Sequence, residues 1–135
     1  PKIYIRDSGL CHTLLRIDSY ENLLAHPVVG SSWESFVIEQ ISTSLPRSVP
    51  VMFYRTQAGA EIDLVIEIAY DKLIAIEVKR SVAPKLSKGL VDTLSSLKPV
   101  KTYIVNAGDD HYPLREDVNV ISLPLLLTEL QKLVK

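Results

Sequence analysis

Two neighbouring stretches of the chain alternate between apolar and other residues with a period of two. They cover residues 61–67 and 73–79, and both are rich in Ile, Val and Leu. This period is typical of β-strands, and the polar segment 70–72 supplies a turn, so the sequence predicts a β-hairpin. Alternation assigns the side chains to two faces: Ile62, Leu64, Ile66, Ile74, Ile76 and Val78 share one, and Glu61, Asp63, Val65, Glu67, Leu73, Ala75, Glu77 and Lys79 share the other.

The rest of the chain predicts an ordered series of helices and strands around this hairpin. Helices are expected over residues 8–17, from 28–32 to about 45, over 86–97 and over 123–134. Further strands are expected over 49–55, 101–106 and 119–122. The helix between the strand ending at 79 and the one beginning at 101 makes a crossover connection. The order therefore predicts a three-layer α/β or α+β domain with a mixed sheet.

Charged residues occupy the hairpin face that also carries Val65 and Ala75. Asp63, Glu77 and Lys79 converge there if the two mixed faces coincide, and charges in such a place are costly unless they are paired or bound to metal. Two nearby carboxylates suit Mg²⁺, and an ammonium group beside them can orient or deprotonate a water that attacks a phosphodiester. An ordinary hairpin with a cross-strand salt bridge explains the same pattern.

Glu34 is a further candidate because it lies in line with the apolar stripe of the helix predicted to end near residue 45. Val37, Ile38, Ile41 and Leu45 follow it at helical spacing. A Glu aligned with such a stripe is either hydrogen-bonded at a buried edge or directed at a functional site. Both interpretations stay open.

Composition narrows the class of protein. A length of 135 residues indicates one domain, and 47% hydrophobic with 23% charged residues is typical of a globular chain. The single cysteine, Cys11, and three scattered histidines do not suggest a zinc site. There is no apolar run of membrane-spanning length and no signal-peptide pattern, so we expect no membrane partner and a cytoplasmic protein. The chain does not begin with Met, which suggests a piece of a longer protein.

The distribution of charge gives arguments both against and for nucleic-acid binding. The net charge of −1 argues against strong binding that is independent of base sequence, because such binding depends on many Lys and Arg contacts to phosphates. The segment 79–101 is nevertheless basic, with Asp92 as its one acidic residue. Its basic residues are Lys79, Arg80, Lys85, Lys88, Lys98 and Lys101. They form either a phosphate-facing patch or a solvated helix face.

Four segments resemble known families in order and spacing. They are Lys-Ile-Tyr-Ile-Arg-Asp-Ser-Gly-Leu (2–10), His-Pro-Val-Val-Gly-Ser-Ser-Trp-Glu-Ser-Phe-Val-Ile-Glu (26–39), Tyr-Arg-Thr-Gln-Ala-Gly-Ala-Glu-Ile-Asp-Leu-Val-Ile-Glu (54–67) and Ile-Glu-Val-Lys-Arg-Ser (76–81). Together they resemble the domain of unknown function at the C-terminus of bacterial and archaeal AAA+-type ATPases. The Asp and Glu-x-Lys on adjacent strands resemble the site of the PD-(D/E)-x-K nuclease superfamily.

The resemblance implies a restriction-endonuclease-like three-layer α/β/α fold with a central mixed β-sheet. It implies a single domain over 1–135, made of an N-terminal extension (1–25) and a core (26–135). Its implied catalytic residues are Glu34, Asp63, Glu77 and Lys79, of which Asp63, Glu77 and Glu34 would hold Mg²⁺. ATP would bind only to an ATPase domain N-terminal to Pro1, because this chain has no Gly-x-x-x-x-Gly-Lys-Ser/Thr loop.

Two functions from different classes are compatible with these residues. In the first, the domain is a Mg²⁺-dependent nuclease-like module of an ATPase, acting on DNA or RNA. In the second, it is a non-catalytic interaction domain of the ATPase, in which the same charged residues form a buried ionic network. Both predict that Glu34, Asp63, Glu77 and Lys79 lie together, and the first predicts that they line a concave site.

Overall fold

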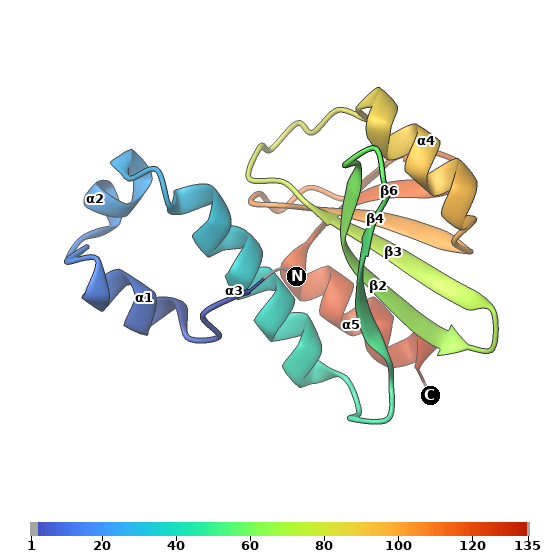
Figure 1. Cartoon of the computed structure of the whole chain (residues 1–135), viewed down its shortest axis with the longest axis horizontal. Helices are drawn as coiled ribbons and strands as arrows, with labels where there is room; N and C mark the ends of the chain where they lie inside the picture. The colour runs from blue at the N-terminus through green and yellow to red at the C-terminus, as the bar shows by residue number, and fades with distance from the viewer. Residues whose placement is uncertain (1–2, 135) are drawn as a thin grey trace.

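The fold is built from a six-stranded mixed sheet with helices on both faces (Figure 1). The computed structural model describes residues 3–134. Its helices are α1 (Ser8–Leu14), α2 (Tyr20–Ala25), α3 (Val29–Ser44), α4 (Lys88–Leu97) and α5 (Leu123–Leu133). Its strands are β1 (Val51–Arg55), β2 (Glu61–Ala69), β3 (Lys72–Val78), β4 (Lys101–Asn106), β5 (Tyr112–Arg115) and β6 (Val118–Ser122). The predicted α/β class with a mixed sheet is confirmed.

Strand order explains why the sheet is mixed. The strands are arranged β1-β2-β3-β4-β6-β5. The hairpin β2–β3 is antiparallel, with Val65 opposite Ala75, so the two mixed faces coincide as predicted. Strands β3 and β4 are parallel, and α4 connects them as a crossover. The sequence did not predict strand β5, which is a short strand at the edge of the sheet and contains Pro113. Proline argues against an internal strand because it cannot donate a backbone hydrogen bond to a neighbouring strand.

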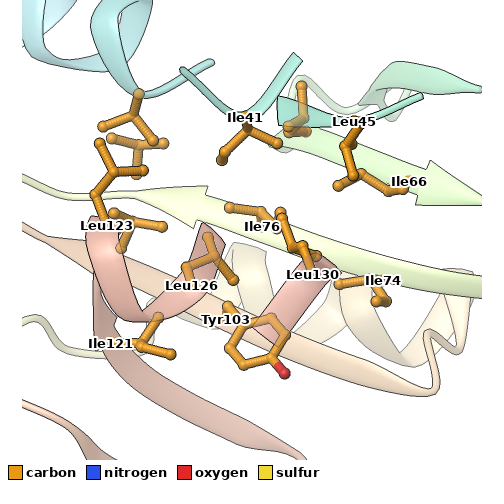
Figure 2. Packing of buried hydrophobic residues seen from close by; sticks show 14 residues of the cluster. Ile41, Leu45, Ile66, Ile74, Ile76, Tyr103, Ile121, Leu123, Leu126 and Leu130 are labelled. Atoms are coloured by element: carbon orange, nitrogen blue, oxygen red, sulfur yellow. The ribbon is translucent and has the colours of Figure 1, made fainter. Parts of the chain in front are cut away.

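Two hydrophobic clusters lie on opposite faces of the sheet. The larger one joins α3 and α5 to the central strands, and Figure 2 shows its side chains gathered between these elements. Its labelled members are Ile41, Leu45, Ile66, Ile74, Ile76, Tyr103, Ile121, Leu123, Leu126 and Leu130. The smaller cluster lies under α4, where Leu90 and Leu94 pack with Val65 and Ala75. Helices α3 and α5 therefore cover one face and α4 covers the other.

A β-bulge in β2 corrects one predicted face. Between Met52 and Tyr54 the partner positions on β2 change from Val65 to Ile62, so β2 contains one extra residue there. Alternation alone placed Ile62 beside Leu64 and Ile66. The bulge moves Ile62 to the opposite face, where it packs with Val65 in the cluster under α4. Asp63 therefore lies within the irregular part of the strand.

The N-terminal arm, residues 3–25, lies outside the sheet beyond α3 (Figure 1). None of the residues of α1 or α2 is buried. Helix α1 begins after Asp7, whose side chain accepts a hydrogen bond from the Leu10 backbone N–H, and ends at Leu14 instead of continuing to residue 17. Helix α2 is an element that the sequence reasoning missed. None of the helices in the described part of the chain has the length and apolar character that a membrane span needs.

Candidate functional site

A cleft of about 390 Å³ lies where α3, β2, β3 and the start of α4 meet. All four residues selected from the sequence, Glu34, Asp63, Glu77 and Lys79, line it. The remaining lining residues come from the turn before β2, from the start of β2, from the end of β3, and from the N-cap and first turn of α4. They are Gly59, Ala60, Glu61, Val78, Ser87, Gly89 and Leu90. The structure therefore brings the four predicted residues into one concave site.

Backbone geometry fixes Asp63 and Glu77 beside each other. Both residues are buried, with 9% and 8% of their surface exposed. Asp63 Oδ2 accepts a hydrogen bond of 2.9 Å from the Val78 backbone N–H, so a side-chain carboxylate, instead of a strand carbonyl, binds β3 at this point. The bulge in β2 makes this possible because it displaces Asp63 from the regular ladder.

Lys79 directly follows β3 and lies beside Glu77 in the cleft. Its Nζ lies 2.6 Å from Glu77 Oε1, and its backbone N–H donates to the Val105 carbonyl of β4. The other oxygen, Glu77 Oε2, is buried and has no hydrogen-bond partner among residues 3–134. A buried carboxylate oxygen without a partner is costly, so Glu77 Oε2 is an acceptor that a water, an ion or a ligand can satisfy.

The electrostatics of the pair set the protonation states. Burial raises the pKa of Glu77, the nearby charge of Asp63 raises it further, and the Lys79 ammonium offsets only part of this rise. For Lys79, burial lowers the pKa, but the hydrogen bond and charge of Glu77, with the charges of Asp63 and Glu34, outweigh burial and raise it. Lys79 is therefore a protonated donor that can orient a water, and the alternative role of a base that deprotonates it is disfavoured.

Glu34 reaches the cleft from α3, and its position depends on the N-terminal arm. The Tyr4 hydroxyl donates a hydrogen bond of 2.6 Å to Glu34 Oε1. Close by, Ser35 Oγ donates to the Ile5 carbonyl, and Arg6 pairs with Glu39 at 2.9 Å. The segment before α1 is therefore bound along α3. Sequence reasoning missed Tyr4, because no local pattern relates a residue in an irregular segment to a helix thirty positions away.

The donor set fits a divalent cation held by two carboxylates. Within residues 3–134, no group of three or more His, Cys, Asp or Glu side chains is placed to hold a metal ion. Asp63 and Glu77 nevertheless provide hard oxygen donors, and no group in the described part of the chain forms a hydrogen bond with Glu77 Oε2. Protein Mg²⁺ sites commonly use one or two carboxylates, with waters and substrate phosphates as the other ligands. Asp63 and Glu77 are therefore the two residues that could hold such a cation, and in the described part of the chain Glu34 does not join them in a group of three ligands.

Sequence comparison with known proteins assigns the chain that forms this cleft to a family. The sequence model of the family described as "Domain of unknown function (DUF4143)" matches residues 29–126. The chain belongs to this family. Every one of the four cleft residues lies in the part of the chain that the DUF4143 model matches, whereas Tyr4, α1 and α2 precede it.

Two mycobacterial proteins are similar to the chain over nearly its whole length. Uncharacterized proteins of Mycobacterium bovis and Mycobacterium tuberculosis are each 38% identical to it over 128 residues. The alignment covers 95% of this chain and 29% of each relative, so the chain spans less than a third of the length of these two proteins. No solved structure matches the chain.

The raised pKa of Glu77 predicts a specific pH dependence of stability. When the pKa of a carboxyl group is higher in the folded than in the unfolded state, the group stabilises the fold fully at pH values below its unfolded pKa, which is near 4.5 for Glu. This stabilisation is lost as the pH rises through the folded-state pKa. In metal-free buffer, Glu77→Gln should therefore gain stability relative to the wild type as the pH rises from about 4.5 to neutrality. Melting temperatures across this range measure the difference.

The matched control is Glu116→Gln, which removes an exposed carboxylate in the β5–β6 turn. Its melting temperature relative to the wild type should not show the same increase with pH. A Glu77→Gln difference that stays flat, or that decreases with pH, would contradict the assignment of a raised pKa to Glu77.

Proposed function

We propose that the cleft is a divalent-metal-dependent site for phosphodiester hydrolysis on DNA or RNA. The observation that carries this proposal is the buried pair Asp63 and Glu77 at the β2 bulge, with Glu77 Oε2 unpaired among residues 3–134 and Lys79 two residues further on, just after β3. The sheet, with α3 and α5 on one face and α4 on the other, is compatible with the restriction-endonuclease-like fold. That fold assignment is part of the proposal.

Each residue of the cleft has a chemical role in this proposal. Asp63 and Glu77 would hold Mg²⁺, which when bound neutralises charge on a phosphate and lowers the pKa of a coordinated water. Lys79, which is protonated, would orient the attacking water and stabilise negative charge that develops on the phosphate. Glu34, held by Tyr4, would keep Lys79 in place through its charge.

The first turn of α4 supports the binding of a phosphate in the same cleft. Ser87 caps this helix by accepting from the Leu90 N–H, and Ser87, Gly89 and Leu90 all line the cleft. The N-terminus of a helix carries a partial positive charge, which favours an anion. Lys85 and Lys88 lie before and within this turn and add positive charge.

We further propose that the domain works as part of a longer cytoplasmic ATPase. The resemblance of four segments to the C-terminal domain of AAA+-type ATPases supports this context, and the two mycobacterial relatives are more than three times the length of the aligned region. Nucleotide hydrolysis would then occur in the ATPase domain, because the 135 residues contain no phosphate-binding loop.

A non-catalytic interaction domain is the second candidate, and one contact favours it. The ion pair between Lys79 Nζ and Glu77 Oε1 occupies one of the carboxylate oxygens at 2.6 Å, as expected of a structural ionic network. In that case the four residues would join α3 to the sheet and the cleft would bind no metal.

Metal titration of the chain with thermal melting tests the proposal. Binding to the folded state alone should raise the free energy of unfolding by about 2.7 kcal/mol when Mg²⁺ or Mn²⁺ is present at a hundred times its Kd. Asp63→Asn should abolish this increase, whereas Asp92→Asn, on the exposed side of α4, should retain it. The absence of both a metal-induced shift and cleavage of single-stranded, duplex and branched substrates would favour the interaction domain.

A further inference from the structure

A second hollow is lined by residues that neighbour the cleft residues in the sequence: Trp33 precedes Glu34, and Arg80 follows Lys79. It has a volume of about 480 Å³ and is formed by the N-terminal arm, α3 and the segment after β3. Tyr20, Trp33, Phe36 and Arg80 are the lining residues that matter here. The metal-site residues do not line it, so the function proposed above leaves it unused. Its size is within the usual range of small-molecule sites, roughly 300–1,000 Å³.

Aromatic side chains give the hollow flat apolar surfaces. Trp33 and Phe36 are stacked on one side of α3, with ring centroids 6.1 Å apart and an angle of 28° between the planes. Tyr20, at the start of α2, is 69% exposed although it lines the hollow. His12 Nε2 and Ser32 Oγ, which lie 2.6 Å apart, provide a polar edge. Flat aromatic surfaces with a polar edge suit a planar heterocycle, because such a ligand stacks on the rings and forms hydrogen bonds at its rim.

Arg80 gives the hollow a positive charge. It is exposed and forms no ion pair with any residue in the described range 3–134. It follows Lys79 in the basic segment 79–101, which continues through Lys85 to Lys88 in the first turn of α4. An unpaired guanidinium at the rim is complementary to a phosphate, which it can bind in a bidentate manner.

The hollow and the cleft share a wall. The Trp33 indole N–H donates to the Lys79 carbonyl at 3.3 Å, so the aromatic surface is bound to the strand that carries the proposed site. Trp33 precedes Glu34 on α3, and Arg80 follows Lys79, and Cα atoms of consecutive residues are only about 3.8 Å apart. The two spaces are therefore close enough to bind neighbouring parts of a single ligand.

We propose that this hollow binds an unstacked base of the nucleic-acid strand whose phosphodiester occupies the cleft. The base would stack against the Trp33, Phe36 and Tyr20 side chains, and Arg80 would bind the phosphate that joins it to the next nucleotide. The inference rests on the proposed function and specifies its substrate class. Bases inside a duplex have no free faces, so the domain would act on single strands, or on nucleotides that are turned out of a duplex.

Trp33 itself reports on occupancy, because it is the only tryptophan in the 135 residues. Short single-stranded oligonucleotides titrated in EDTA should quench its fluorescence in a saturable manner, since a stacked base quenches an indole. An oligonucleotide of the same length in which every base is replaced by an abasic site keeps the phosphates, and it should bind with little or no quenching. Measuring in EDTA separates this result from any cleavage.

Variants identify the residues responsible. Phe36→Ala or Tyr20→Ala should weaken binding by about 5- to 150-fold, the range found for loss of one base-stacking side chain. Arg80→Ala should weaken binding and reduce the slope of log K against log salt by roughly 0.7, as expected for one lost phosphate contact to a single strand. Tyr70→Ala and Arg47→Ala remove an exposed aromatic and an exposed cation away from the hollow, and both should bind as the wild type does.

Other outcomes would overturn the inference in distinguishable ways. Equal quenching by the abasic strand would remove the role of the base. Oligonucleotide binding or cleavage without any response of Trp33 would overturn the hollow alone and leave the proposed function intact. Quenching by another segment of a longer parent protein, with none by oligonucleotides, would assign the hollow to contacts between domains.

Discussion

Replacing Lys79 by Met is expected to lower the rate of Mg²⁺-dependent cleavage by about a hundredfold or more while leaving the fold intact. The ammonium lies 2.6 Å from Glu77 Oε1, and surrounding carboxylates keep it protonated. It is therefore placed to donate to a water or to a charged phosphate oxygen. Met fills a similar volume but cannot donate a hydrogen bond. Single-turnover cleavage assays, with circular dichroism to check the fold, measure the effect.

Lys72→Met is the matched control, because this lysine begins the same strand at its exposed end. It should cleave at the wild-type rate. If the domain is instead an interaction module, the wild type has no activity to lose. Lys79→Met would then act on stability: removing the ammonium raises the pKa of Glu77 further, and the domain should be less stable at neutral pH. A fully active Lys79→Met variant would remove this residue from the proposed mechanism.

Sequence periodicity was sufficient for most of the fold because the main elements bury one regular face. Helix α3, strand β4 and helix α5 all lie close to the predicted ranges. The two elements that it missed lack such a face. Helix α2 has no buried residue, and β5 is an edge strand with Pro113 at its centre. Neither contributes an apolar period that distinguishes it from a loop.

The candidate site was predictable to the extent that it depends on neighbouring positions in a strand. Glu77 lies near the end of β3 and Lys79 directly follows that strand, two residues later, so continued alternation places them on one face. Asp63 joins them in the structure, although strict alternation fails around it. The bulge shifts Ile62 to the other face, and nothing in the local sequence marks an extra residue. The position of the bulge depends on how β1 pairs with β2.

Contacts between distant segments could not be predicted from periodicity. Tyr4 binds Glu34, and Trp33 binds the Lys79 carbonyl, across separations of 30 and 46 residues. Both depend on how the N-terminal arm and α3 pack against the end of β3. The division of 1–25 as an extension and 26–135 as a core stays a prediction, and Tyr4 shows that a residue of the predicted extension contacts Glu34 in the cleft.

Leu64→Ala is expected to lower the free energy of unfolding by roughly 2–5 kcal/mol, without a specific effect on metal binding. Leu64 is 4% exposed and packs with α3 and α5 in the larger cluster, directly after Asp63 in the bulged part of β2. Truncation would leave a cavity that the surrounding strands cannot fill, because β2 is paired on both sides. Urea denaturation gives the free energy.

Leu125→Ala, at a 44% exposed position of α5, is the control and should lower the free energy of unfolding by less than about 0.5 kcal/mol. Equal losses in the two variants would show that Leu64 does not face the core, and would contradict both the bulge and the placement of Asp63 beside Glu77.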